Sequence, residues 1–223
     1  MRPAPPALFV VSGAAGLVLQ VAWFRLLALS LGGTLAASTA VLTSFMAGLG
    51  LGAFLAGRLA PRLTRPLRTY GLLELGAALA ALSTLPLLRG LDSAYASFAH
   101  VIGDSPGPLL ALRILLAALA LMPTTIFMGA TLPVLCQALA ADPESSGSHS
   151  GGLYALNTLG AVGGTLLALF WLLGNVGLSG SVLIAAAADL AIAVIVLVLE
   201  SSEALPHGAV PVARGLPPRG SGQ

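Results

Sequence analysis

The sequence predicts an all-α membrane protein, a bundle of six transmembrane helices with both termini in the cytoplasm. Of its 223 residues, 57% are hydrophobic and only 8% are charged, and the mean hydropathy is +0.97, whereas an ordinary soluble domain is about a quarter charged. A helix needs roughly 20 apolar residues to cross about 30 Å of hydrocarbon. Six segments meet this requirement, at residues 8–31, 34–57, 67–88, 109–136, 151–174 and 178–199.

The first and fourth segments need separate comment. The apolar stretch of the first is longer than the core of a signal peptide, about 7–15 residues, and further membrane segments follow it. We therefore expect it to be retained as the first helix. The fourth segment contains Pro123 and Pro133, so we expect it either to be kinked or to cross by about Ile126 and continue along the interface.

Charge in the short connections predicts the orientation. Short loops rich in arginine stay in the cytoplasm, and four arginines crowd the connection between the second and third segments: Arg58, Arg62, Arg65 and Arg68. The connection between the third and fourth segments carries Arg89 against Asp92 and Asp104. We expect it to face outward, with its stretch DSAYASFAHVIG forming a short helix in the interface.

The chain divides into a six-helix transmembrane domain, residues 1–200, and a Pro- and Gly-rich cytoplasmic tail, residues 201–223, which we expect to be disordered. The net charge of +2 gives no basis for a nucleic-acid partner. The single cysteine, Cys136, excludes an intrachain disulfide, and we predict no metal site and no cofactor. The expected location is a bacterial plasma (inner) membrane.

Small residues predict where helices pack closely. Lipid tails are as apolar as leucine, so helix association in a bilayer relies on close contact between small side chains. The alternatives are tight packing within one bundle and a moving interface of the kind found in transporters. The glycines predicted to pack lie in the first, second and fifth segments: Gly13, Gly16, Gly48, Gly52, Gly160 and Gly164.

Four ionisable residues lie within the spans: Arg25, Glu74, Arg113 and Asp189. A charge at the bilayer centre costs about 2.5–3.5 kcal/mol on insertion scales. Arg25 and Arg113 lie near the outer ends and can snorkel, and Glu74 lies roughly 10 Å from the cytoplasmic end, within range of the arginine loop. Only Asp189 is too deep to reach an interface. It is either a carboxyl that locks the bundle or a proton or cation site.

Helical geometry adds further polar candidates. Tyr154 and Asn157 share one face of the fifth segment, and Gln20 shares a face of the first with Gly13. Arg25 lies about 140° away from Gln20. We therefore expect Gln20 to point into the bundle with Asn157 as its partner, while Arg25 serves another face.

Five stretches carry a family resemblance: SGAAGLVLQVAWFRLL, FMAGLGLGAFLAGRLAPR, RPLRTYGLLELG, MGATLPVL and LYALNTLGAVGGTLLA. As an ordered set over about residues 8–200 they resemble the membrane region of fused major-facilitator/spermidine synthase-like proteins, a family also described as membrane-bound polyamine aminopropyltransferase-like. The resemblance implies a bundle similar to half of a major-facilitator transporter, whose halves are built from three-plus-three inverted repeats.

Two departures from the family pattern limit what the resemblance implies. Pro61 stands where such transporters usually carry the acidic residue of a Gly-x-x-x-Asp-Arg loop. Family members usually continue into a soluble synthase domain that binds a decarboxylated S-adenosylmethionine-like donor, whereas only a short tail follows Leu199. We therefore expect no donor-binding or catalytic domain in this chain.

Three functional hypotheses follow. The first is a membrane module that anchors a separate polyamine aminopropyltransferase-like enzyme or handles its cationic substrate or product, with Glu74 and Asp189 as counter-charges. The second is a half-size transporter that acts as a homodimer, and the third is an inactive truncated relic. The expected partners are the lipid bilayer, a soluble synthase-like enzyme and a second copy of the chain.

Overall fold

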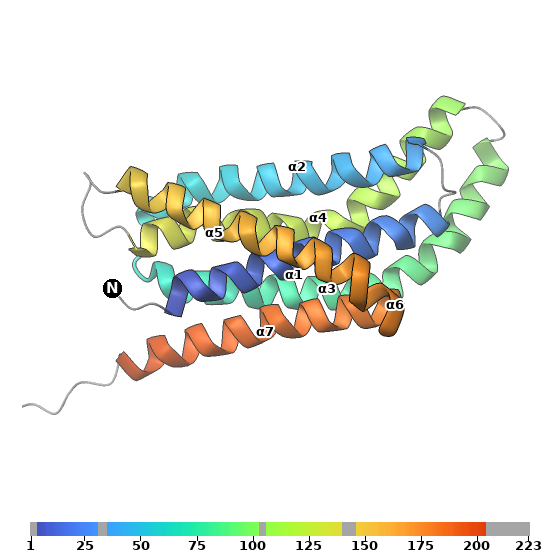
Figure 1. Ribbon diagram of the computed structural model, residues 1–223. Helices are drawn as coiled ribbons and strands as arrows, with labels where there is room; N and C mark the ends of the chain where they lie inside the picture. The colour runs from blue at the N-terminus through green and yellow to red at the C-terminus, as the bar shows by residue number, and fades with distance from the viewer. Residues whose placement is uncertain (1–3, 31–34, 103–105, 140–145, 204–223) are drawn as a thin grey trace, which may run out of the picture.

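In the computed structural model the chain forms long helices that run back and forth along one axis (Figure 1). The structure describes residues 4–30, 35–102, 106–139 and 146–203, and these contain no strand. The long helices are α1 (Ala4–Ser30), α2 (Leu35–Leu59), α3 (Pro66–Ile102), α4 (Pro106–Leu139), α5 (Ser146–Leu167) and α7 (Gly177–Glu203). Three short elements connect them: η1 (Ala60–Arg62), the π-helical η2 (Ala168–Leu172) and α6 (Leu173–Asn175).

Six stretches of the described chain are long and apolar enough to cross a membrane, and each overlaps a segment predicted from the sequence. They are Pro6–Ala28, Ser38–Arg62, Pro66–Leu88, Gly107–Leu139, Ser150–Asn175 and Gly177–Ser202. The prediction of an all-helical protein with six candidate membrane spans is confirmed. Residues 204–223, most of the predicted tail, lie outside the described residues.

The region between the third and fourth spans differs from the prediction. We expected an outward loop with a separate short helix, but α3 continues to Ile102 with Pro86 inside it. α4 is likewise continuous from Pro106 to Leu139, with Pro123 and Pro133 inside it. Broken backbone hydrogen bonds are costly where water is scarce, so a helix in a bilayer tolerates proline without ending. α3 and α4 extend beyond the other helices at one end of the bundle (Figure 1).

A tight turn joins α5 to α7. The helix widens into the π-helical η2 and passes through α6, and the Val176 N–H donates to the Leu172 carbonyl at 2.9 Å. Gly177 then has φ of 73°, a left-handed conformation that glycine adopts without a steric penalty. The turn reverses the chain so that α7 runs back toward the end where α1 begins (Figure 1).

The main helix contacts follow a repeated pattern. The largest interfaces among the described helices are α2–α4, α1–α5, α3–α4, α3–α7 and α1–α7. Exchanging α1 with α4, α2 with α5 and α3 with α7 reproduces this same set. The first three and last three long helices therefore pack as two equivalent groups, and α3–α7 is the interface that maps onto itself.

The interior contains two apolar clusters. One surrounds Trp23 and Phe45, whose rings lie 6.5 Å apart, and the other surrounds Phe9 and Tyr70. The Trp23 indole donates a hydrogen bond to the Thr84 hydroxyl at 2.9 Å. This bond satisfies the indole N–H, which would otherwise be unpaired in an apolar core.

Candidate functional site

Polar side chains, most of them buried, gather where α1, α3 and α7 meet. Tyr70 and Glu74 lie on successive turns of α3, Asp189 comes from α7, and Ser12 comes from α1. Glu74 is 1% exposed, and Tyr70 and Asp189 are 0% exposed. This site therefore places two carboxyl groups in the interior of the bundle.

The two carboxyls and the two hydroxyls lie close to one another. The Ser12 and Tyr70 hydroxyls approach the Glu74 carboxyl, and Asp189 lies within electrostatic range of both Glu74 and Tyr70. Four buried polar atoms still have no hydrogen-bond partner: Tyr70 Oη, Glu74 Oε1 and Asp189 Oδ1 and Oδ2. Buried polar atoms are normally paired, so this cluster keeps unused capacity to form hydrogen bonds.

No basic side chain among the described residues forms an ion pair with either carboxyl. Glu74 was expected to lie within range of the arginine loop, but it is buried and unpaired. Arg25 is exposed and does not pair with Asp189. The Arg113 side chain is not among those that the structure describes. An unpaired charge in hydrocarbon is costly, so the cluster needs a proton or a cation to become neutral.

Small neighbours allow the two carboxyl-bearing helices to approach. A Cβ on Gly71 of α3 would lie 3.0 Å from Leu197 Cγ of α7, and Ala185 and Ala186 of α7 are buried. Tyr70, one turn before Glu74, was not identified from the sequence. Its four-residue spacing from Glu74 was the available signal, because residues four apart lie on the same helical face.

Glu74 and Asp189 lie on corresponding helices of the repeated packing pattern. They lie on α3 and α7, which exchange with each other when the two groups of helices are exchanged. Each is followed by leucine, in Glu74-Leu75 and Asp189-Leu190. The repeated packing is thus what brings one carboxyl from each group to the central interface.

Glycines predicted to pack lie at the contact between α1 and α5. A Cβ on Gly160 would overlap the Val10 carbonyl oxygen, and one on Gly164 would overlap that of Ala14. Contacts four residues apart on both helices show that α1 and α5 run parallel. Neither glycine can be replaced here without separating the two backbones.

The polar residues predicted near this contact have different places. Gly13 lies against the Asn157 backbone, and Asn157 Nδ2 donates to the Phe9 carbonyl at 3.3 Å. The expectation that Asn157 would pair with Gln20 is therefore wrong, because its amide binds the α1 backbone nearer the start of that helix. Gln20 is half-buried, and Tyr154 is 62% exposed.

The contact between α2 and α4 is built in the same way. A Cβ on Gly52 would overlap the Ile126 carbonyl oxygen, and one on Gly129 would overlap that of Leu49. Gly129 was not among the predicted packing residues, although the sequence around it contributed to the family resemblance. Each helix supplies a glycine against which a backbone carbonyl of the other helix packs.

The other two predicted glycines differ from each other. Gly48 lies against Thr125, and a Cβ on Gly48 would overlap the Thr125 hydroxyl. Gly16 is buried, but a Cβ there would meet Met128 Cε at 3.7 Å, which is an ordinary contact. Gly48 is therefore at a close helix contact and Gly16 is not.

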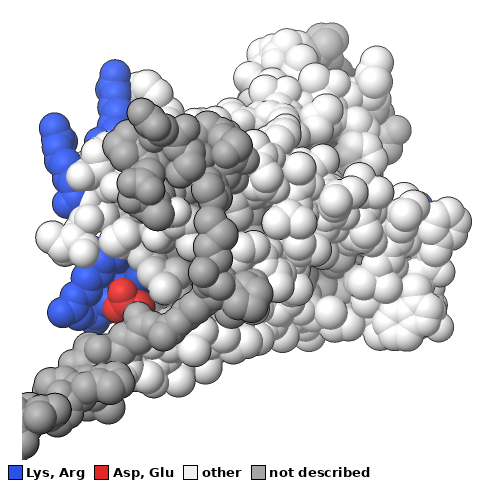
Figure 2. Space-filling model, turned by 60° about the vertical axis from the view of Figure 1, so that its left-hand side comes forward, with Lys and Arg blue, Asp and Glu red and all other residues white. Residues whose placement is uncertain are grey.

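The exposed arginines of the helix 2 to helix 3 connection lie together at one end of the bundle, here called the arginine end (Figure 2). The Arg58 guanidinium lies over the Phe54 ring, 4.2 Å from its centroid, in a cation–π contact. α1 begins and α7 ends at this same end (Figure 1). The set consists of Arg58, Arg62, Arg65 and Arg68.

These features define the class of protein as a polytopic α-helical membrane protein with a buried carboxyl cluster. No known family model matches the chain, and no curated protein or solved structure is similar to it. Among the described residues, no group of three or more His, Cys, Asp or Glu side chains is arranged to hold a metal ion.

Proposed function

We propose that the chain is an integral membrane module that binds and passes a cation through the Glu74–Asp189 cluster, with the proton as the simplest cargo. The observation that supports this is the pair of buried carboxyls without a basic partner in the described chain. Ionisable residues inside membrane spans commonly mark ion pathways or proton relays.

The chemistry of the cluster suits a positive charge. Two carboxylates close together in a low-dielectric interior repel each other, and a shared proton or a bound cation removes that repulsion. The hydroxyls of Ser12 and Tyr70 are near Glu74, and they supply further oxygens to hydrate or relay the cargo. All the groups needed to receive a proton therefore lie within one site.

The family resemblance adds a second class of cargo, the protonated amine. An ammonium group pairs well with carboxylates, and this would make the chain a module that handles a polyamine substrate or product. Both carboxyls are closed off from solvent, so an amine requires α3 and α7 to separate, whereas a proton does not. The buried geometry favours the proton.

Flux measurements in vesicles test the proposal. The full chain is reconstituted in liposomes, and proton flux is followed with an internal pH dye and amine uptake with labelled spermidine. We expect proton flux that both Glu74→Gln and Asp189→Asn abolish, while Glu200→Gln, a change in a carboxyl near the arginine end, leaves it intact. Absence of flux in the unaltered chain, or flux in both cluster variants equal to that of the unaltered chain, contradicts the proposal.

The arginine end supports the alternative function of anchoring a soluble synthase-like enzyme. Four exposed arginines at one end attract an acidic surface, and this attraction weakens with salt. Co-purification from native membranes at low and high salt, with Arg58→Gln/Arg62→Gln as the comparison, tests it. If the chain is purified without any enzyme at both low and high salt, this function is contradicted.

The proposed membrane setting is that of a major-facilitator-like half with the arginine end in the cytoplasm. The equivalent packing of the first and last three helices supports an inverted repeat, and the arginines support the orientation. Labelling of single cysteines introduced at the arginine end, in intact and permeabilised bacterial cells, tests this orientation. Labelling of intact cells by a membrane-impermeant reagent contradicts it.

A further inference from the structure

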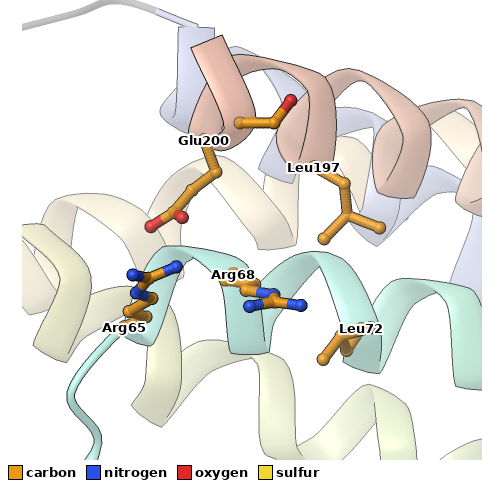
Figure 3. A pocket seen from close by; sticks show the side chains of 6 residues that line it. Arg65, Arg68, Leu72, Leu197 and Glu200 are labelled. Carbon is orange, nitrogen blue, oxygen red and sulfur yellow. The ribbon is translucent and has the colours of Figure 1, made fainter. Parts of the chain in front are cut away.

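A half-open pocket lies at the arginine end, between the beginning of α3 and the end of α7 (Figure 3). Its volume is about 390 Å³. It is separate from the buried carboxyl cluster. The residues that line it are Arg65, Arg68, Leu72, Leu197, Glu200 and Ser201.

The pocket changes from polar to apolar with depth. Arg65 directly precedes the candidate span Pro66–Leu88, and Glu200 lies in the last turn of Gly177–Ser202. These groups therefore lie at the ends of two candidate spans, where the surface of a membrane is expected. Leu72 is one helical turn, about 6 Å, beyond Arg68, and Leu197 lies on the facing helix (Figure 3). An occupant that fits this gradient has a polar head and an apolar tail.

The charges in the pocket are mixed and are not paired with one another. Arg65 and Arg68 are exposed, Glu200 is half-buried, and no ion pair joins these side chains. Figure 3 shows both arginines and Glu200 beside the same space between the two helices. A guanidinium group binds phosphate through two parallel hydrogen bonds. A carboxylate beside it accepts hydrogen bonds from an ammonium group.

We infer that this pocket binds a phospholipid with an ethanolamine headgroup. The phosphate would lie on Arg65 and Arg68, the primary ammonium on Glu200 and Ser201, and the start of an acyl chain on Leu72 and Leu197. Phosphatidylglycerol has no cation for Glu200. The ammonium of phosphatidylcholine has no N–H to donate. This inference is independent of the proposed cation function.

Lipid retention by the purified full chain tests the inference. The chain in detergent is mixed with equal amounts of phosphatidylethanolamine, phosphatidylglycerol and phosphatidylcholine, and the bound lipid is identified by native mass spectrometry. We expect the ethanolamine lipid to be retained most. Arg68→Gln should reduce its retention about tenfold, because a charge-assisted hydrogen bond to phosphate is lost. Arg62→Gln, at the same end but outside the pocket, should leave retention unchanged.

Glu200→Gln separates recognition of the headgroup from attraction of any phosphate. This variant should still bind phospholipid but should lose the preference for ethanolamine over glycerol. Equal retention of the three lipids by the unaltered chain overturns the inference. So does a loss in Arg62→Gln as large as that in Arg68→Gln.

Soluble competitors distinguish a lipid from a free phosphate compound. Inorganic phosphate and glycerophosphoethanolamine are added at millimolar concentration to the lipid-bound chain. We expect neither to displace the lipid, because neither has a tail to contact the two leucines. Displacement by inorganic phosphate would make the pocket a phosphate site and would overturn the lipid assignment.

Discussion

The glycine-packed helix pairs and the α3–α7 pair are held together by different means. In α1–α5 and α2–α4, glycines of one helix lie against backbone carbonyls of the other, so these contacts depend on the absence of a side chain. In α3–α7, two buried acidic side chains lie within electrostatic range of each other. The glycine contacts should therefore be sensitive to the size of a substituted side chain, and the α3–α7 contact to its charge.

The largest expected effect is a size change at a glycine contact. Gly52→Leu places a side chain against the Ile126 carbonyl, whereas Gly50→Leu on the same helix enters open space. We expect Gly52→Leu to lower the free energy of unfolding by about 3 kcal/mol or to prevent assembly, and Gly50→Leu to have little effect. Unfolding titrations in mixed detergent measure the difference. Equal stability of the two variants contradicts the proposed contact.

A second pair of glycines, adjacent in the chain, lies on α5. Gly164 lies against the Ala14 carbonyl, while its neighbour Gly163 has no atom near its Cβ position. We expect Gly164→Leu to cost about 2 kcal/mol, less than Gly52→Leu because α5 is the least buried of the candidate spans. Gly163→Leu is the control, and thermal unfolding of both is the measurement. The reverse order of stability would exclude the α1–α5 contact.

At the Glu74–Asp189 pair we expect a change of charge to matter more than a change of side-chain size. Glu74→Gln and Asp189→Asn keep the size of the side chain and remove its charge, so we expect stability to change by no more than about 1 kcal/mol while proton flux is lost. The double variant should be less than additive by about 1 kcal/mol, since the two groups interact. The free energies of unfolding of the single and double variants form the double-mutant cycle, and proton flux is measured on the same proteins. Strictly additive effects would show that the carboxyls act independently.

The smallest expected effect concerns the Asn157 hydrogen bond. Asn157→Leu removes the bond to the Phe9 carbonyl, which in a membrane is worth about 0.6 kcal/mol. Thr158→Val is the matched control, because the Thr158 hydroxyl bonds only within its own helix, to the Tyr154 carbonyl. Thermal unfolding of the two variants is the measurement. A larger loss in the control would contradict this assignment.

Prediction from sequence succeeded where the signal was local. The six apolar segments correspond to six candidate spans, because hydropathy is a property of consecutive residues. The continuation of α3 past Pro86 was not predicted, since proline is a reliable helix breaker only where water replaces the lost hydrogen bond. For the candidate site, both carboxyls, Glu74 and Asp189, were identified from the sequence. The four-residue spacing of Tyr70 from Glu74 was a local signal that went unused, whereas nothing local to the chain showed that Asp189 would lie near them.

Hydropathy alone thus establishes the helical class and the number of candidate spans, since each segment's transfer into lipid depends on its own composition. Which helices pair was decided by the tertiary structure, because lipid gives no hydrophobic preference among apolar faces and close fit selects the partners. As a result of this close fit, α5 packs against α1 and α4 packs against α2. It also brought Glu74 to Asp189, residues far apart in the chain whose chemistry depends on their being close.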